Sequence, residues 1–143
     1  MNDLIAACTE NAEYMFPGYR LQFTPGADCY VRGNAERLEQ VLMNLISNAV
    51  KYSPVNKDIL LGVVSEDGQV KVFVQDFGIG LSDLQREKIF ERFYRVNEQN
   101  HMAGGLGMGL YISMEIVKGH DGHIEVESEI GKGSTFYVFL PEL

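Results

Sequence analysis

Apolar residues recur along this chain with two different spacings, which separate predicted helices from predicted strands. From Asn34 to Tyr52 they return every three or four residues, a period that predicts one long helix with a buried stripe. Asn34 is the predicted N-cap of this helix, and Ser53-Pro54 predicts its end. The residues of the stripe are Leu38, Val41, Leu42, Leu45, Ile46 and Ala49.

The same helix carries a second, polar stripe made of Gln40, Asn44, Asn48 and Lys51. At one residue per 100° these four side chains fall within about 80° of one another, beside the apolar stripe rather than opposite it. A row of amides ending in a lysine suits an oxygen-rich ligand or a metal ion. A solvated flank is the alternative, because asparagine is only mildly unfavourable on a helix surface. The helix alone leaves both interpretations open.

Two strands are predicted, Ile59–Glu66 and Gln69–Gln75, joined by the two-residue turn Asp67-Gly68. In the second strand the valines occupy every other position, and the same alternation places Asp76 on the face of the valines. An unpaired carboxylate is costly to bury, so we expect a partner or a ligand for Asp76. A polar turn between a strand and a helix is the alternative interpretation.

The remaining segments complete an α+β pattern. Helices are predicted from Asp3 to Phe16, from the capping box at Ser82 through Phe90, and from the glycines before Leu110 to Gly119. The polar, aperiodic residues 96–103 predict a mobile loop. Further strands are predicted at Arg20–Thr24, Tyr30–Arg32, His123–Ser128 and Thr135–Leu140. This order favours a two-layer α/β sandwich, with helices on one face of a mixed sheet.

Composition narrows the classes of function. The 143 residues suit a single domain, and a net charge of −8 argues against nucleic acid as a partner. Cys8 and Cys29 lie far apart in the sequence and form no CxxC motif, which indicates reduced thiols. No apolar run approaches 18 residues, so we expect a cytoplasmic domain that does not insert into a membrane.

Glycine clusters supply the chemical signals. Gly105, Gly107 and Gly109 precede a predicted helix, where free N–H groups and a partial positive charge favour phosphate. A polar loop rather than a strand comes before them, which disfavours a dinucleotide-binding fold. Asp76-Phe77-Gly78-Ile79-Gly80 combines an inward carboxylate with glycines that leave room for a flat ring. The carboxylate could accept a hydrogen bond from an exocyclic amine such as that of adenine. No nucleophilic triad and no zinc-type ligand spacing is apparent.

Four motifs in order, followed by a glycine turn, resemble the ATP-binding catalytic domain of bacterial sensor histidine kinases. This domain shares a superfamily with DNA gyrase, the 90-kDa heat-shock chaperones and mismatch-repair ATPases. The resemblance implies the Bergerat α/β sandwich, formed as a single domain by residues 1–143. Its segments are an N box at 37–52, a G1 box at 76–80, an F box at 90–96, a lid at 97–104, a G2 box at 105–110 and a last glycine turn at 131–136.

The resemblance also implies a role for individual residues. Asn48 would coordinate Mg²⁺ through its amide oxygen, while Asn44 and Lys51 would lie toward the phosphates of ATP. Tyr52 would pack near the base or sugar. Asp76 would accept a hydrogen bond from the adenine amine. The other implied ATP-binding residues are Gly78 and Gly80 beside the ring, Arg92 and Arg95 at the terminal phosphate, Gly105, Leu106, Gly107, Met108, Gly109 and Leu110 at the phosphates, and Thr135 in the last turn.

One position separates the subclasses of the superfamily. The hydrolytic members have a water-activating glutamate four residues before the metal-binding asparagine, whereas this chain has Asn44, which cannot act as a base. The resemblance therefore implies a protein-histidine kinase, with Asn44, Lys51 and Arg95 as catalytic residues. A regulatory nucleotide-binding module and a stand-alone ATPase are the alternatives.

The phosphoacceptor histidine of such kinases lies on a helical hairpin that this sequence lacks. The expected partners are therefore a dimerisation/phosphoacceptor domain and the receiver domain of a response regulator. The isolated domain is expected to be monomeric.

Overall fold

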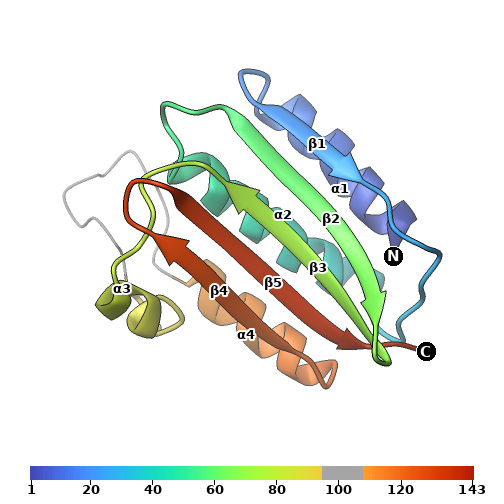
Figure 1. Ribbon diagram of the computed structural model, residues 1–143. Helices are drawn as coiled ribbons and strands as arrows, with labels where there is room; N and C mark the ends of the chain where they lie inside the picture. Colours follow the sequence, from blue (N-terminus) through green and yellow to red (C-terminus); the bar gives the residue numbers. More distant parts are fainter. Residues whose placement is uncertain (95–107) are drawn as a thin grey trace.

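Helices cover one face of a mixed sheet in the computed structural model, which describes residues 1–94 and 108–143 (Figure 1). The helices are α1 (Asn2–Met15), α2 (Ala35–Lys51), α3 (Asp83–Lys88) and α4 (Gly109–Gly119). The strands are β1 (Arg20–Thr24), β2 (Asp58–Glu66), β3 (Gln69–Asp76), β4 (His123–Glu129) and β5 (Gly133–Pro141).

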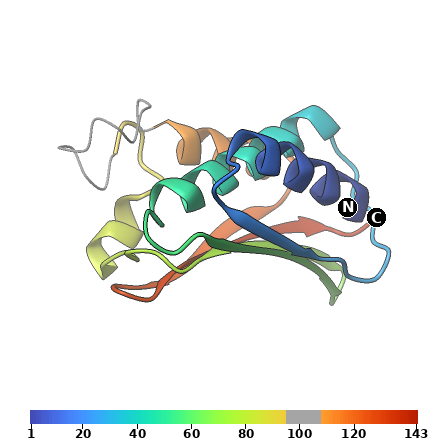
Figure 2. The same ribbon diagram turned by 90° about the horizontal axis from the view of Figure 1, so that it is seen from above.

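The sheet has the strand order β1-β2-β3-β5-β4. The edge strand β1 runs parallel to β2, and the other neighbouring strands are antiparallel. Figure 2 shows α1, α2 and α4 in one layer above the sheet, with α3 at one end. The predicted α+β sandwich with a mixed sheet and one helical face is therefore confirmed.

Helix α2 provides the centre of the core. All six residues of its predicted apolar stripe are buried, at 5% exposure or less. The predicted cap also forms, because the Asn34 side chain accepts the Arg37 N–H at 3.0 Å. On the facing sheet, the alternation of β3 buries Val70, Val72 and Val74 and carries Asp76 to the same side.

Helices α2 and α4 lie side by side and run in opposite directions. At one end, the Asn34 backbone N–H donates to Nε2 of His120 at 3.0 Å. Because Nε2 accepts this bond, Nδ1 of His120 carries the proton and donates to the Ile116 carbonyl at 2.8 Å. A neutral imidazole therefore joins the N-terminus of α2 to the C-terminus of α4.

The predicted strand Tyr30–Arg32 is wrong, since these residues have no regular secondary structure. Their segment instead receives both chain termini, which lie close together in Figure 1. The Met1 amino group donates to the Cys29 carbonyl at 2.8 Å, and the Leu143 N–H donates to the Tyr30 carbonyl at 2.8 Å. The carbonyls of Cys29 and Tyr30 are thus paired without a ladder, which the local alternation could not reveal.

Candidate functional site

The polar stripe of α2 reaches the end of the helix next to the end of β3. Gln40, Asn44 and Asn48 are half-buried at the margin of the core, and Lys51 lies exposed in the last turn. Tyr52 follows as the C-cap and is half-buried. The predicted position of this stripe, beside the apolar face rather than opposite it, is confirmed.

Asp76 is a buried carboxylate at the last position of β3, with 3% exposure. Its Oδ1 accepts the Gly78 N–H at 2.9 Å. Burial raises the pKa of Asp76, while hydrogen bonds from the backbone amides of Gly78 and Ser134 oppose that rise. Within residues 1–94 and 108–143 no cation forms an ion pair with it. The carboxylate therefore retains acceptor capacity for an N–H donor from a ligand.

The glycines after Asp76 allow two backbone segments to touch. A Cβ on Gly78 would lie 1.8 Å from the Tyr52 carbonyl oxygen, and one on Gly80, which has φ +71°, would lie 2.1 Å from the Glu129 carbonyl oxygen. The neighbouring Ile79 N–H donates to the Tyr52 carbonyl at 3.0 Å. The loop is thus held between the end of α2 and the β4–β5 hairpin. The positions of Gly78 and Gly80 beside an adenine ring stay a prediction.

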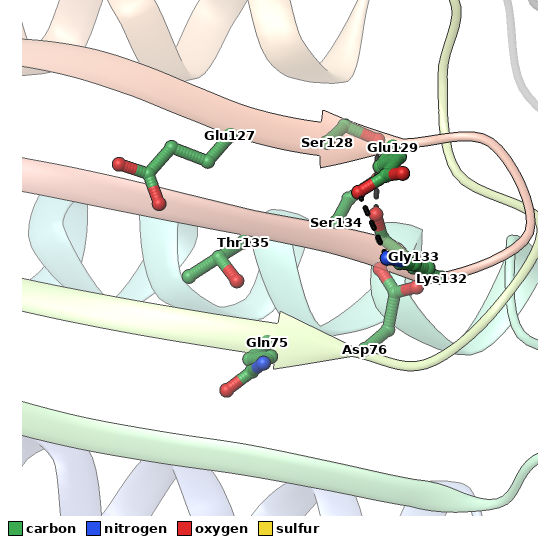
Figure 3. Close-up of a pocket in the computed structure, with 9 residues that line it drawn as sticks. All are labelled: Gln75, Asp76, Glu127, Ser128, Glu129, Lys132, Gly133, Ser134 and Thr135. Carbon is green, nitrogen blue, oxygen red and sulfur yellow. Dashed lines mark hydrogen bonds and ion pairs between the residues drawn. The ribbon is translucent and has the colours of Figure 1, made fainter.

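A network of serines holds the β4–β5 hairpin beside this loop (Figure 3). The Ser128 hydroxyl accepts the Leu81 N–H at 2.7 Å, donates to the Gly133 carbonyl at 3.0 Å and lies 2.7 Å from the Ser134 hydroxyl. Ser134 is buried, and its backbone amide donates a hydrogen bond to Asp76. Sequence reasoning missed Ser128 and Ser134, although alternation along each strand places both on the buried face.

Thr135 lies on the other face of the sheet from Asp76. It is paired in register with Gln75 and Glu127, and Figure 3 shows these three side chains in one row. They belong to a hollow of about 290 Å³, lined by Gln75, Asp76, Glu127, Ser128, Glu129, Lys132, Gly133, Ser134 and Thr135. The Thr135 side chain thus lies on the opposite face of the sheet from Asp76, although both residues line this hollow, and its role at the nucleotide stays a prediction.

Helix α4 begins next to the polar stripe of α2. Met108 is its N-cap and Gly109 its first residue. The Asn44 amide nitrogen donates to the Ser113 hydroxyl at 3.1 Å and to the Gly109 carbonyl at 3.4 Å. Leu110 is 8% exposed and belongs to the core, so its side chain packs rather than presenting itself to solvent.

The F box and the G2 box are described only in part. Phe90 packs edge-on against Phe136, with ring centroids 6.3 Å apart. The Arg92 guanidinium is exposed and lies over the Tyr111 ring of α4, 5.4 Å from its centroid. The predicted roles of Arg95, Gly105, Leu106 and Gly107, and the predicted lid at 97–104, fall outside the described residues.

The donor set near α2 suits a metal ion held by few protein ligands. The described residues contain no group of three or more His, Cys, Asp or Glu that could hold a metal by itself. The half-buried amide of Asn48 offers one neutral oxygen, and Mg²⁺ commonly takes one or two protein ligands together with substrate phosphates. The residues therefore fit Mg²⁺ that arrives with a nucleotide, and Asn48 is the residue that would hold it.

A buried acceptor carboxylate, an amide stripe and the start of a helix thus meet at one end of an α/β sandwich, as in a nucleotide-binding catalytic domain. Residues 33–143 match the model of the family described as histidine kinase-, DNA gyrase B- and HSP90-like ATPase. The chain belongs to this family and is a catalytic domain of the sensor histidine kinase type.

Individual relatives agree with this assignment. The chain is 36% identical to the sensor histidine kinase RppB of Synechocystis, over 99% of this chain and 32% of RppB. It resembles the solved catalytic domain of histidine kinase ThkA with a TM-score of 0.84 and 26% identity, over 99% of this chain and 92% of that one. Full-length ShkA in complex with AMPPNP gives a TM-score of 0.84 at 28% identity, over 99% of this chain and 30% of ShkA. The chain therefore spans about a third of the length of RppB. In its described part, no helix has the length and apolarity needed to cross a membrane.

Proposed function

We propose that this chain binds Mg²⁺·ATP and supplies the γ-phosphoryl group to a histidine on a separate dimerisation/phosphoacceptor domain. The observation that carries the proposal is the buried carboxylate of Asp76 at the same end of the sandwich as the amides of Asn44 and Asn48. ShkA has the same fold and was solved in complex with AMPPNP, which supports an ATP-type ligand for this chain. The receiver domain of a response regulator would accept the phosphoryl group next.

Asp76 would select the base. Its carboxylate is an acceptor, and adenine presents an exocyclic amine where guanine presents a carbonyl oxygen. ATP should therefore bind more tightly than GTP. Asp76→Asn should weaken ATP, with Asp67→Asn in the exposed β2–β3 turn as the matched control. Equal affinity of the wild type for ATP and GTP would remove Asp76 from this role.

Asn48 would hold Mg²⁺ through its side-chain oxygen, and Lys51 would add positive charge near the phosphates. Bound Mg²⁺ supplies charge neutralisation for the phosphoryl group during transfer. Titration calorimetry of Asn48→Ala with ATP should show that added Mg²⁺ no longer strengthens binding. Asn11→Ala, on the exposed face of α1, is the matched control and should behave like the wild type.

Phosphoryl transfer at this site would rest on positioning and charge rather than on a protein nucleophile. Asn44 stands where a hydrolytic relative would need a carboxylate, and its nitrogen is bonded to α4. This favours transfer over hydrolysis. The test compares phosphate release by the chain alone with labelling of an added phosphoacceptor domain. Rapid release without labelling would favour the ATPase instead.

A further inference from the structure

The amide of Asn44 is fixed by the neighbouring helix. Its nitrogen has two N–H groups, and α4 provides two acceptors for them, the Ser113 hydroxyl at 3.1 Å and the Gly109 carbonyl at 3.4 Å. A carbonyl oxygen can only accept, so the contact with Gly109 requires the nitrogen rather than the oxygen of the amide on this side. Among the described residues no donor is bonded to Oδ1 of Asn44.

In the part of the chain that the structure describes, the contact with Asn44 is the one side-chain hydrogen bond of Ser113. Ser113 is completely buried, and it lies on the face of α4 that buries Leu110 and Val117, three residues before it and four after. A hydroxyl in such an apolar row is expected to have a partner, because a buried unpaired polar group is costly. The partner is 69 residues away in the sequence, on α2.

The register between α2 and α4 supports the same orientation of the Asn44 amide. The imidazole of His120 joins the far end of α4 to the start of α2, about three helical turns from Asn44. With α4 tied to α2 at both ends, the first turn of α4 cannot slide along α2 without breaking a hydrogen bond. The acceptors for Asn44 are therefore held in place.

We propose that Ser113 is a positioning residue that locks the amide of Asn44, so that Asn44 offers the nucleotide site an acceptor oxygen and no donor. This inference rests on the proposed function. An acceptor oxygen suits Mg²⁺ or one of its water ligands, and it does not suit a phosphate oxygen, which is itself an acceptor. Ser113 should therefore affect the part of nucleotide affinity that depends on Mg²⁺.

The test is titration calorimetry with AMPPNP, with and without Mg²⁺, on the wild type, Ser113→Ala, Asn44→Ala and the double variant. Ser113→Ala should lower the affinity with Mg²⁺ by roughly threefold to tenfold, the range expected for one hydrogen bond. Its affinity without Mg²⁺ should stay within about twofold of the wild type. In the Asn44→Ala background the Ser113 substitution should have no further effect, because the group that it positions is gone.

Two further variants separate positioning from stability. Thr9→Val removes another buried hydroxyl, in α1, and should leave the response to Mg²⁺ unchanged. Ser113→Cys keeps a similar volume and a weak acceptor, so it should fold even where Ser113→Ala does not, and its Mg²⁺-dependent affinity should lie between those of the wild type and Asn44→Ala.

Equal losses with and without Mg²⁺, or an undiminished Ser113→Ala effect in the Asn44→Ala background, would overturn the inference and leave the proposed function standing. Failure of the wild type to bind AMPPNP would overturn both.

Discussion

The contact between Gly78 and the end of α2 allows a sharp test of how the Asp76 loop is held. In Gly78→Ala the added Cβ would lie 1.8 Å from the Tyr52 carbonyl oxygen and 2.7 Å from the Ser53 Cα. Both neighbours are backbone atoms, so no side chain can rotate away. Because ordinary contacts begin near 3.4 Å, the loop and the end of α2 must separate by more than an ångström.

The cost of that separation has two parts. Overpacking of a rigid contact typically costs about 1–3 kcal/mol, and the hydrogen bond from Ile79 to the same Tyr52 carbonyl adds about 0.5–1.5 kcal/mol if it is lost. Gly78→Ala should therefore lower the free energy of unfolding by about 2–4 kcal/mol. The same displacement moves the Gly78 N–H away from Asp76, so ATP affinity should fall as well.

Urea denaturation followed by circular dichroism measures the loss, and two other glycines calibrate it. Gly68→Ala has no neighbour within 4 Å but has φ +75°, so it should cost only about 1 kcal/mol. Gly119→Ala has neither problem and should stay within about 0.5 kcal/mol of the wild type. If Gly78→Ala were no less stable than Gly68→Ala, close packing would not be what requires glycine at this position.

Three further outcomes follow from burial and capping. Burial raises the pKa of Asp76, so the folded protein holds this proton at a higher pH than the unfolded chain does. The free energy of unfolding should therefore fall as the pH rises above 3.8, and this fall should be absent in Asp76→Asn when both proteins are titrated with urea at several pH values. Burial also raises the pKa of Cys8 to about 11, and Cys29 is buried too. A thiol reagent at about pH 8 should therefore label both cysteines only after unfolding, and rapid labelling of the native protein would contradict this. Asn34→Ala should cost about 1 kcal/mol of stability in urea, and an unchanged midpoint would show that the cap contributes nothing.

Local periodicity was sufficient to predict the layers of this fold. The stripe of α2 and the alternation of β3 each depend on residues only a few positions apart, and both are buried on the predicted face. The inward position of Asp76 followed from the same alternation. Such features are set by the geometry of a single element, which the sequence determines directly.

Pairing between distant segments could not be predicted in this way. Tyr30–Arg32 has the composition of a strand, yet it joins no sheet, and the Tyr30 carbonyl accepts the N–H of the C-terminal Leu143 instead. The resemblance implies Thr135 at the nucleotide, which stays a prediction, and it does not reveal that the register of β5 turns Thr135 to the open face and Ser134 to the face of Asp76. A shift of one residue along a strand exchanges its faces, and only the assembled sheet fixes that register.

Asn44 shows how sequence and structure contribute different parts of one argument. The sequence makes it informative because it is not a glutamate, so the position lacks a base for water. The structure adds that its amide nitrogen donates to two acceptors on α4. A carboxylate here would lack those donors and would face the acceptor oxygen of Gly109, which disfavours it. The acceptors on α4 thus favour an amide over an acid at this position. The same contacts therefore account for the absence of a general base here.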